Sequence, residues 1–122
     1  MGLFDTTQLG LEQALAGAQL RQRALANNIA NANTPGFKRS DVDFQSSLKS
    51  ALQSPDANSR LHSLSFEATV DGSSSMRADG NNVDIDAEMA MLTENSLQYQ
   101  SLVVVARARH QMLQVAMGTR TG

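Results

Sequence analysis

The chain has 122 residues, a formal net charge of −2, no cysteine, and aromatic side chains at only 4% of its positions. The length fits one ordinary domain, the lack of cysteine excludes disulfides and thiolate chemistry, and the shortage of aromatic residues favours long helices over a β-sandwich. Lysine and arginine are scattered, so no basic face indicates a nucleic-acid partner, and no stretch approaches the roughly 18 apolar residues of a membrane span.

Residues 1–34 predict a first long helix, over about residues 5–33. Their apolar positions recur every seven residues in two neighbouring rows, and the good helix formers alanine, leucine, glutamine and arginine dominate the segment. Pro35 and Gly36 then end the helix, because proline disfavours helix in the residue before it and glycine lets the chain turn. The rows define one side of a candidate contact seam: Leu11, Leu15, Ala18 and Leu25.

Residues 84–122 predict a second long helix, over about residues 84–117. Two apolar rows keep a seven-residue spacing along the whole segment, which is typical of coiled coils. Asp84 is the expected N-cap, Asp86 and Glu88 follow in the first turn, where the helix dipole favours carboxylates, and Gly118 is the expected terminator. The rows define the other side of the seam: Ile85, Met89, Leu92, Tyr99, Val103, Ala106 and Leu113.

Residues 35–83 combine a junction with a serine-rich connector. We expect a short helix after Phe44, and the alternating apolar residues from Leu64 to Val70 predict at most one short strand. The predicted fold class is therefore all-α. Two long terminal helices pair as a coiled-coil-like hairpin and form one axial domain from both termini, while the middle segment is loosely ordered.

Such a hairpin would leave many apolar side chains of the second helix in water. Those that lie off the seam are Met91, Leu97, Leu102, Val104, Val105, Met112 and Val115. Exposed apolar surface of that extent usually marks an interaction site. The sequence therefore predicts a subunit whose fold is completed by neighbouring chains.

Residues for catalysis or metal binding are scarce. There are two histidines, and His110 has no second ligand three or four positions away on its helix. Residues 79–86 are rich in side-chain oxygen, but the glycine falls at the wrong position for a calcium loop. An enzyme built on Asp84, Asp86 and Glu88 would need a concave pocket and a convergent base. We therefore expect no catalysis, no cofactor, no metal and no small-molecule substrate.

Asparagines crowd the end of the first predicted helix, within the segment ANNIANANTPGF at residues 26–37. Asparagine is a weak helix former that can bond nearby backbone groups, so the segment is either an elaborate helix stop or a junction that docks on neighbouring chains. Asn28 lies near the seam, where a polar side chain costs stability but can specify register. The candidate junction residues are Asn27, Asn28, Ile29, Asn31, Asn33, Thr34, Pro35, Gly36 and Phe37.

Residues 26–37 closely resemble the N-terminal signature shared by bacterial flagellar rod and hook proteins. That family has coiled-coil-forming terminal helices and a variable middle. Residues 38–44, 80–89 and 95–100 are similar to segments of a proximal rod member, and the short middle differs from the hook and distal rod proteins, which carry extra domains there. The resemblance does not extend to residues 46–77.

The resemblance implies a structural subunit of the proximal rod, the periplasmic drive shaft that links the membrane ring to the hook and is required for flagellar assembly and motility. The implied partners are further copies of the chain, the other proximal rod proteins, the rod-to-ring adaptor and the membrane ring. Export would use the flagellar type III apparatus without a cleaved signal peptide, in agreement with residues 1–5, which lack a basic, apolar leader.

Two alternatives remain at this point. The first is another proximal rod protein of the same family. The second is a helical adaptor unrelated to flagella, which accounts for the paired helices but gives no reason for the asparagine-rich junction.

Overall fold

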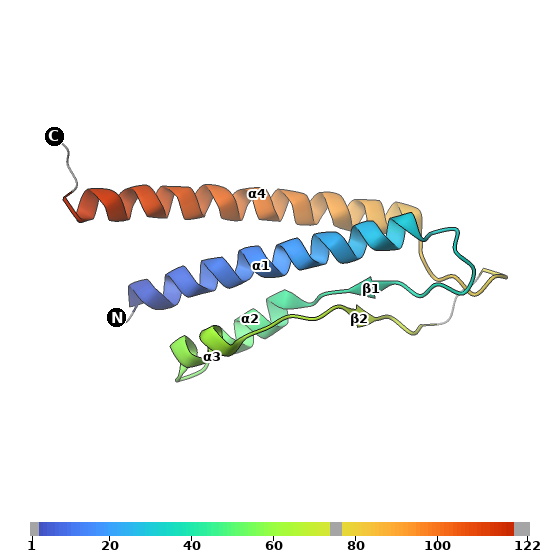
Figure 1. Ribbon diagram of the computed structural model, residues 1–122, viewed down its shortest axis with the longest axis horizontal. Coiled ribbons are helices and arrows are strands. Elements are labelled where there is room, and N and C mark those ends of the chain that lie inside the picture. The colour runs from blue at the N-terminus through green and yellow to red at the C-terminus, as the bar shows by residue number, and fades with distance from the viewer. Residues whose placement is uncertain (1–2, 74–76, 119–122) are drawn as a thin grey trace.

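The computed structural model describes residues 3–73 and 77–118. Two long antiparallel helices, α1 (Leu3–Ala30) and α4 (Ile85–Ala116), lie side by side and set the length of the molecule (Figure 1). Little of the chain is strand, so the predicted all-α class with long terminal helices is confirmed. Met1, Gly2 and the serines at 74 and 75, on which the leader and linker predictions partly rest, lie outside the described residues.

The middle of the chain is more ordered than its composition led us to expect. Helices α2 (Phe44–Leu52) and α3 (Ala57–Ser63) pack against α1, and strands β1 (Ser40–Asp41) and β2 (Thr69–Val70) form a two-residue antiparallel ladder beside them (Figure 1). The sequence predicted α2 and at most one short strand within residues 64–70, where β2 lies, but it predicted neither α3 nor β1. Elements this short are held by contacts with α1 rather than by their own propensity, so they leave little signal in the sequence.

The helix ends follow local chemistry closely. Asp84 caps α4, because its side chain accepts a hydrogen bond from the Ala87 amide at 3.3 Å, and Gly118 follows the helix with a φ of 73°. Both predictions are confirmed. Helix α1 ends at Ala30, slightly earlier than predicted, because the chain turns through the asparagine-rich segment before it reaches Pro35.

The apolar core is small and centres on Phe44 at the start of α2. Its ring meets that of Phe66 edge to face at 6.1 Å and packs against Ala18 of α1. Gly17 makes this approach possible, since a Cβ there would lie 2.5 Å from two carbons of the Phe44 side chain. Most of the second half of α4 contributes nothing to this core, which leaves its outward side uncovered.

Candidate assembly site

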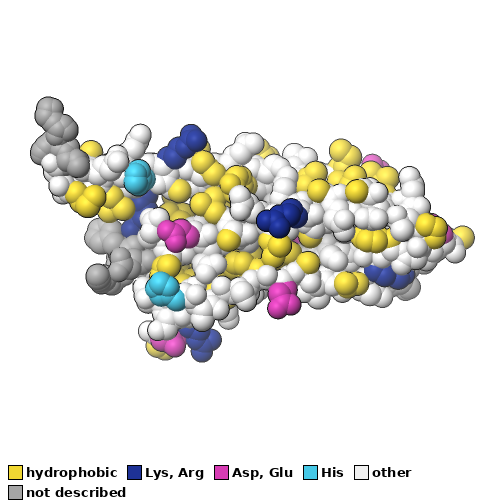
Figure 2. Space-filling model, viewed as in Figure 1, with side chains coloured by type: hydrophobic (Ala, Val, Ile, Leu, Met, Phe, Trp, Pro, Cys, Tyr) yellow, Lys and Arg dark blue, Asp and Glu magenta, His cyan; other side chains and the backbone are white. Residues whose placement is uncertain are grey.

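The outward side of α4 carries the largest exposed apolar residues of the long helices. We define the outer face of α4 as Leu97, Val104, Val105, Met112 and Val115, whose side chains are 51–78% exposed. Hydrophobic side chains come to the surface along the α4 side of the molecule in Figure 2. These five residues were predicted to lie in water, whereas Met91 and Leu102, which were grouped with them, are half-buried.

The predicted seam residues occupy graded positions between α1 and α4. Ala18 and Leu25 are fully buried. Half-buried positions are held by Leu11, Leu15, Leu92, Tyr99, Val103, Ala106 and Leu113.

Two predicted seam residues lie outside the helix contact, and this corrects the seam. Ile85 and Met89 are 44% and 53% exposed, while Glu88 and Asn95 are buried in their place. The reason is geometric. Residues seven apart on a straight α-helix drift by about 20° per heptad, so a row that starts beside the seam enters it only further along the helix.

Asn28 ties three segments of the chain together. Its side-chain amide donates to the Ser40 carbonyl at 2.7 Å and to Glu88 Oε1 at 2.9 Å, and its oxygen accepts from the Ser40 amide at 2.9 Å. The residue is fully buried. The end of α1, strand β1 and the start of α4 are thus fixed relative to one another by one polar side chain.

Glu88 and Arg39 form the charged part of the same cluster. Arg39 donates to both carboxylate oxygens of Glu88 and also reaches Asp41 and Asp71, at 3.4 Å each. The hydrogen bond to Glu88 raises the pKa of Arg39 above its ordinary value, although burial opposes this. Glu88 was expected only to favour the helix dipole, and it is instead a buried ion-pair partner.

Asp41 links the cluster to the middle of α1. Its carboxylate accepts from Arg21 Nε at 2.8 Å and from the Val42 amide at 2.7 Å. Burial by itself would raise the pKa of Asp41, but the hydrogen bonds from Arg21 and Val42, together with Arg39, hold that pKa below its ordinary value. The carboxylate is therefore ionised wherever the fold is intact near neutral pH.

Two further asparagines join the loops at the same end of the molecule. Asn81 donates to the carbonyls of Asn31 and Thr34 at 2.9 and 2.8 Å and accepts from the Val83 amide. Asn82 accepts from the Arg39 amide and donates to the Asp71 carbonyl, each at 2.8 Å. We call the set Asn28, Arg39, Asn81, Asn82 and Glu88 the asparagine junction.

The sequence prediction found Asn28 but did not include Asn81 and Asn82 among the junction residues. Their signal was present, since the helix cap needs only Asp84 and leaves two adjacent asparagines upstream of it unexplained. What each amide bonds, however, depends on segments about 40 to 50 residues away. Local propensity has no access to such partners.

The other predicted junction residues lie nearer the surface. Asn27, Asn33, Thr34, Pro35 and Gly36 are exposed, and Ile29, Asn31 and Phe37 are half-buried.

These surface residues shape the turn rather than the core. Asn31 bonds the Asn27 carbonyl at 2.9 Å and accepts from the Thr34 hydroxyl at 3.1 Å. Gly36 has a φ of 74° and donates its amide to the Asp79 carbonyl at 2.8 Å, and a residue with a Cβ would be strained in that conformation. The segment is thus a helix stop that also contacts the loop before α4 of the same chain, and its docking on neighbouring chains stays a prediction.

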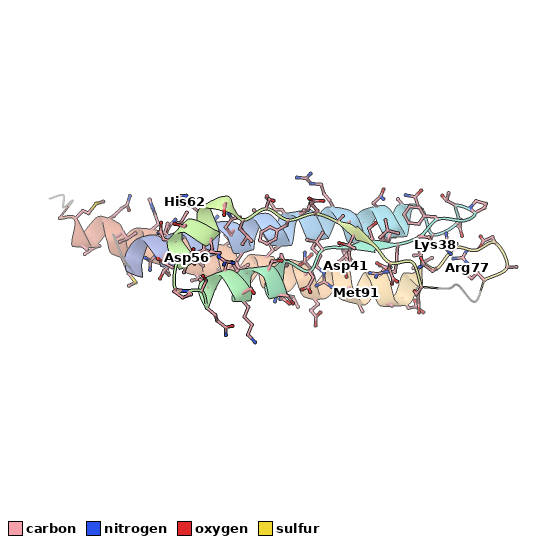
Figure 3. The ribbon with its side chains drawn as sticks, turned by 90° about the horizontal axis from the view of Figure 1, so that it is seen from below. Lys38, Asp41, Asp56, His62, Arg77 and Met91 are labelled. Carbon is pink, nitrogen blue, oxygen red and sulfur yellow. The ribbon has the colours of Figure 1, made fainter. Side chains whose placement is uncertain are left out.

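Apart from the ion pairs around Arg39 and Asp41, the described titratable side chains are spread along the molecule. Asp56 and His62 lie at the α2–α3 end of the molecule, while Lys38 and Arg77 lie at the opposite end (Figure 3). Within residues 3–73 and 77–118, no three histidine or acidic side chains gather closely enough to hold a metal ion. Over the same residues, no helix has the length and apolar character that crossing a membrane requires.

Paired terminal helices, a specific polar junction and an apolar face left open define a helical assembly subunit. Residues 11–38 match the family model described as flagella basal body rod protein. The chain is 38% identical over 111 aligned residues to flagellar basal body rod protein FlgB of Bacillus subtilis, covering 84% of this chain and 86% of the relative.

Other relatives are similar at comparable levels. FlgB of Escherichia coli K12 is 36% identical, covering 73% of this chain and 76% of the relative, and FlgB of Borreliella burgdorferi is 36% identical, covering 70% and 76%. The chain belongs to the family of flagellar basal body rod proteins and is a structural subunit of the flagellar rod. Within that family these relatives are all FlgB, so the resemblance is to this member.

Proposed function

We propose that the chain is a proximal rod subunit, part of the drive shaft that joins the membrane ring to the hook, and that flagellar assembly and motility require it. The two terminal segments, residues 1–34 and 84–122, form the axial domain, and residues 35–83 form the junction and connector. The role is purely structural, without catalysis or cofactor. The similarity to FlgB over most of the chain supports this assignment.

The partners we propose are further copies of the chain, the other proximal rod proteins, the rod-to-ring adaptor and the membrane ring. The chain reaches them through the flagellar type III export apparatus without a cleaved signal peptide. The observation that carries an assembly role is the outer face of α4, because a folded monomer that exposes so many valine, leucine and methionine side chains on one helix has an interface left to fill.

The mechanical role follows from the helix pair. A drive shaft transmits torque through stiffness along and between its subunits. Long helices packed side by side supply many small contacts with little slack, because well-packed interiors resist compression. The asparagine junction adds stiffness at one end of the hairpin, where hydrogen bonds of defined geometry hold α1, β1 and α4.

The test is a charge placed on the outer face. In a strain whose own gene is deleted, Val104→Asp should abolish swimming and remove the chain from purified basal bodies, because a buried carboxylate at the interface costs several kcal/mol. The matched control is Val70→Asp on β2. Val70 is exposed to nearly the same degree, 61% against 64% for Val104, yet lies outside the outer face.

The Val70→Asp strain should swim. Both variants should be made in normal amounts and keep the helix content of the unchanged chain, since each site is already in water. Normal swimming of the Val104→Asp strain would refute an assembly role for the outer face.

A further inference from the structure

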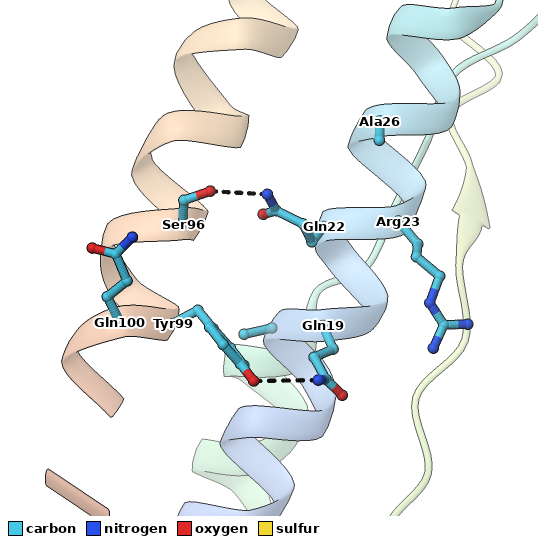
Figure 4. A pocket seen from close by; sticks show the side chains of 8 residues that line it. Gln19, Gln22, Arg23, Ala26, Ser96, Tyr99 and Gln100 are labelled. Carbon is cyan, nitrogen blue, oxygen red and sulfur yellow. Dashed lines mark hydrogen bonds between the residues drawn. The ribbon is translucent and has the colours of Figure 1, made fainter. Parts of the chain in front are cut away.

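A groove runs between α1 and α4. One part is a hollow of about 510 Å³ with Ala18 and Ala26 of α1 and Tyr99 of α4 among its lining residues (Figure 4). Two hydrogen bonds cross it, from Gln22 to the Ser96 hydroxyl at 2.9 Å and from Gln19 to the Tyr99 hydroxyl at 3.3 Å. The hollow thus has an apolar floor and amide groups on its walls.

The groove continues along the same two helices. A second hollow of about 460 Å³ has Leu15 of α1 and Val103 of α4 in its lining. On α4 the two hollows share one helix face, since Ser96, Val103 and His110 follow one another at intervals of seven residues. We call the two hollows together the α1–α4 groove.

The lining of the two hollows carries only positive charge, although the exposed Glu12, which accepts a hydrogen bond from Gln8, stands beside the second hollow. None of the residues that line the two hollows is acidic, whereas Arg23 and Arg107 stand exposed on the rims of the groove. Neither arginine forms an ion pair with a residue that the structure describes. A partner that fits this groove therefore has apolar side chains flanked by carboxylates.

The chain itself presents such a surface. On α4, Asp86 and Glu94 are exposed and share a helix side with Leu97 and Val104, the first residues of the outer face. The two carboxylates have no ion-pair partner within residues 3–73 and 77–118. The outer face of α4, which forms an apolar ridge, and the two carboxylates beside it thus complement the apolar floor and the arginine rims of the α1–α4 groove.

We propose that the outer face of α4 in one copy of the chain packs into the α1–α4 groove of the next copy, with Asp86 and Glu94 set against the arginine rims. The inference rests on the proposed rod function and adds which two surfaces meet. Because ridge and groove are different surfaces, the contact is heterologous, and each added copy leaves a fresh ridge and a fresh groove. Such a contact extends an assembly in one direction instead of closing a pair.

The absence of native cysteine makes disulfide mapping a direct test. Two tagged versions of the chain are produced together in the deletion strain, one with Ala26→Cys in the groove and one with a ridge cysteine, in turn Leu97→Cys, Val104→Cys and Val115→Cys. Ala26 is exposed and lines the first hollow, so its replacement disturbs no buried contact. Basal bodies are purified and oxidised mildly, and the disulfides are identified from the tags.

At least one of the three outer-face cysteines should form a mixed disulfide with Ala26→Cys. The yield of that disulfide should be severalfold higher than the yield of any disulfide that joins the same outer-face position in two copies of the chain. The matched control, Val70→Cys in place of Ala26→Cys, should give no mixed product. Dominant pairing of ridge with ridge would overturn the proposal, and so would a lack of mixed disulfide for all three ridge positions in basal bodies that contain the chain.

The two levels of inference fail separately. If the chain is absent from basal bodies, the proposed rod function is wrong and this contact falls with it. If the chain is present but cross-links through other surfaces, the rod function stands and only the ridge-in-groove contact is wrong.

Discussion

The two halves of α4 differ in what their side chains contact. Its first turns are fixed inside the monomer by polar side chains with named partners, Glu88 with Arg39 and Asn28, and Asn95 with the Ala18 carbonyl and Gln22. From Leu97 onward the same helix turns apolar side chains to water. Buried hydrogen bonds require defined geometry and therefore specify one arrangement of the helices. Apolar surface needs only a complementary shape, so it can be buried later against another chain.

That difference separates folding from assembly along one helix. The asparagine junction decides how the hairpin closes, at a cost in desolvation that hydrogen bonds must offset. Hydrogen bonds offset nearly all of this desolvation, because among the described residues only Asn95 Oδ1 is a buried side-chain polar atom without a hydrogen-bond partner. The outer face contributes little to the monomer, so changes there should affect assembly and leave folding intact.

Removing the central carboxylate should have the largest effect on the monomer. Glu88→Ala leaves the buried Asn28 and the half-buried Arg39 without their shared partner, and breaking a buried ion pair in this way costs about 3–5 kcal/mol of unfolding free energy. The matched control is Glu94→Ala on the exposed side of the same helix, expected within about 0.5 kcal/mol of the unchanged chain. Urea unfolding followed by circular dichroism measures both, and equal losses would mean that the junction is not special.

Replacing asparagines of residues 26–37 should lower the unfolding free energy more where the side chain is buried than where it lies near the surface. Asn28→Ala strands the Ser40 amide, the Ser40 carbonyl and Glu88, at a cost of about 1–3 kcal/mol. Asn31→Ala loses only bonds near the surface and should cost less than about 1 kcal/mol. The same unfolding experiment separates them. Similar losses for the two variants would reduce the segment to a helix stop.

A pair of glycine variants tests the packing of the middle layer against α1. Gly17→Ala places a methyl group 2.5 Å from the Phe44 side chain, and overpacking of this kind costs about 1–3 kcal/mol, partly offset by up to about 1 kcal/mol of helix propensity. At Gly10 the nearest atom would be 3.6 Å away, so Gly10→Ala should stabilise the helix by up to about 1 kcal/mol. A gain in thermal stability for both variants would mean that α2 does not dock as described.

The smallest expected effect is on acid stability. Because the pKa of Asp41 is lower in the folded chain than in the unfolded one, its ionised form stabilises the fold above the unfolded pKa of about 3.9, and that contribution is lost as pH falls through the folded value. Asp41→Asn should therefore flatten the loss of stability below about pH 4. Unfolding midpoints measured from pH 7 to pH 2 check this. If the midpoint of Asp41→Asn falls with pH as steeply as that of the unchanged chain, Asp41 does not stabilise the fold through its ionised form.

The sequence was most informative where a rule acts within one or two turns of chain. The Asp84 cap, the Gly118 stop and the short helix after Phe44 were all predicted, because each depends on neighbours in sequence. The exposure of all five residues of the outer face was also predicted, since a hairpin has too little surface to cover them. Asn28 stood out because it lies near the predicted seam, within a cluster of asparagines that a simple helix stop does not need.

The misses share a different cause. The partners of Glu88 and Asn95 lie about 50 to 80 residues away in sequence, and the contact between Gly17 and Phe44 joins α1 to a layer that was expected to be loosely ordered. The spacing of apolar residues within α4 does not predict partners that lie so far away in the sequence. Ile85 and Met89 were placed in the seam for a different reason, because a heptad row drifts by about 20° per heptad on a straight helix and enters the seam only further along.

The sequence by itself thus determined the two long helices, where they stop, and that apolar surface would remain. Helix propensity, caps and apolar spacing are local, so they can be deduced from neighbouring residues alone. Only the tertiary structure decided the rotation of α4 against α1, which buries Glu88 and Asn95 and turns Leu97 and Val104 outward. That rotation is set by polar partners brought together from distant segments. At about 100° per residue, Asn95 and Leu97 fall on nearly opposite sides of α4, so one side closes the hairpin and the other is left for another chain.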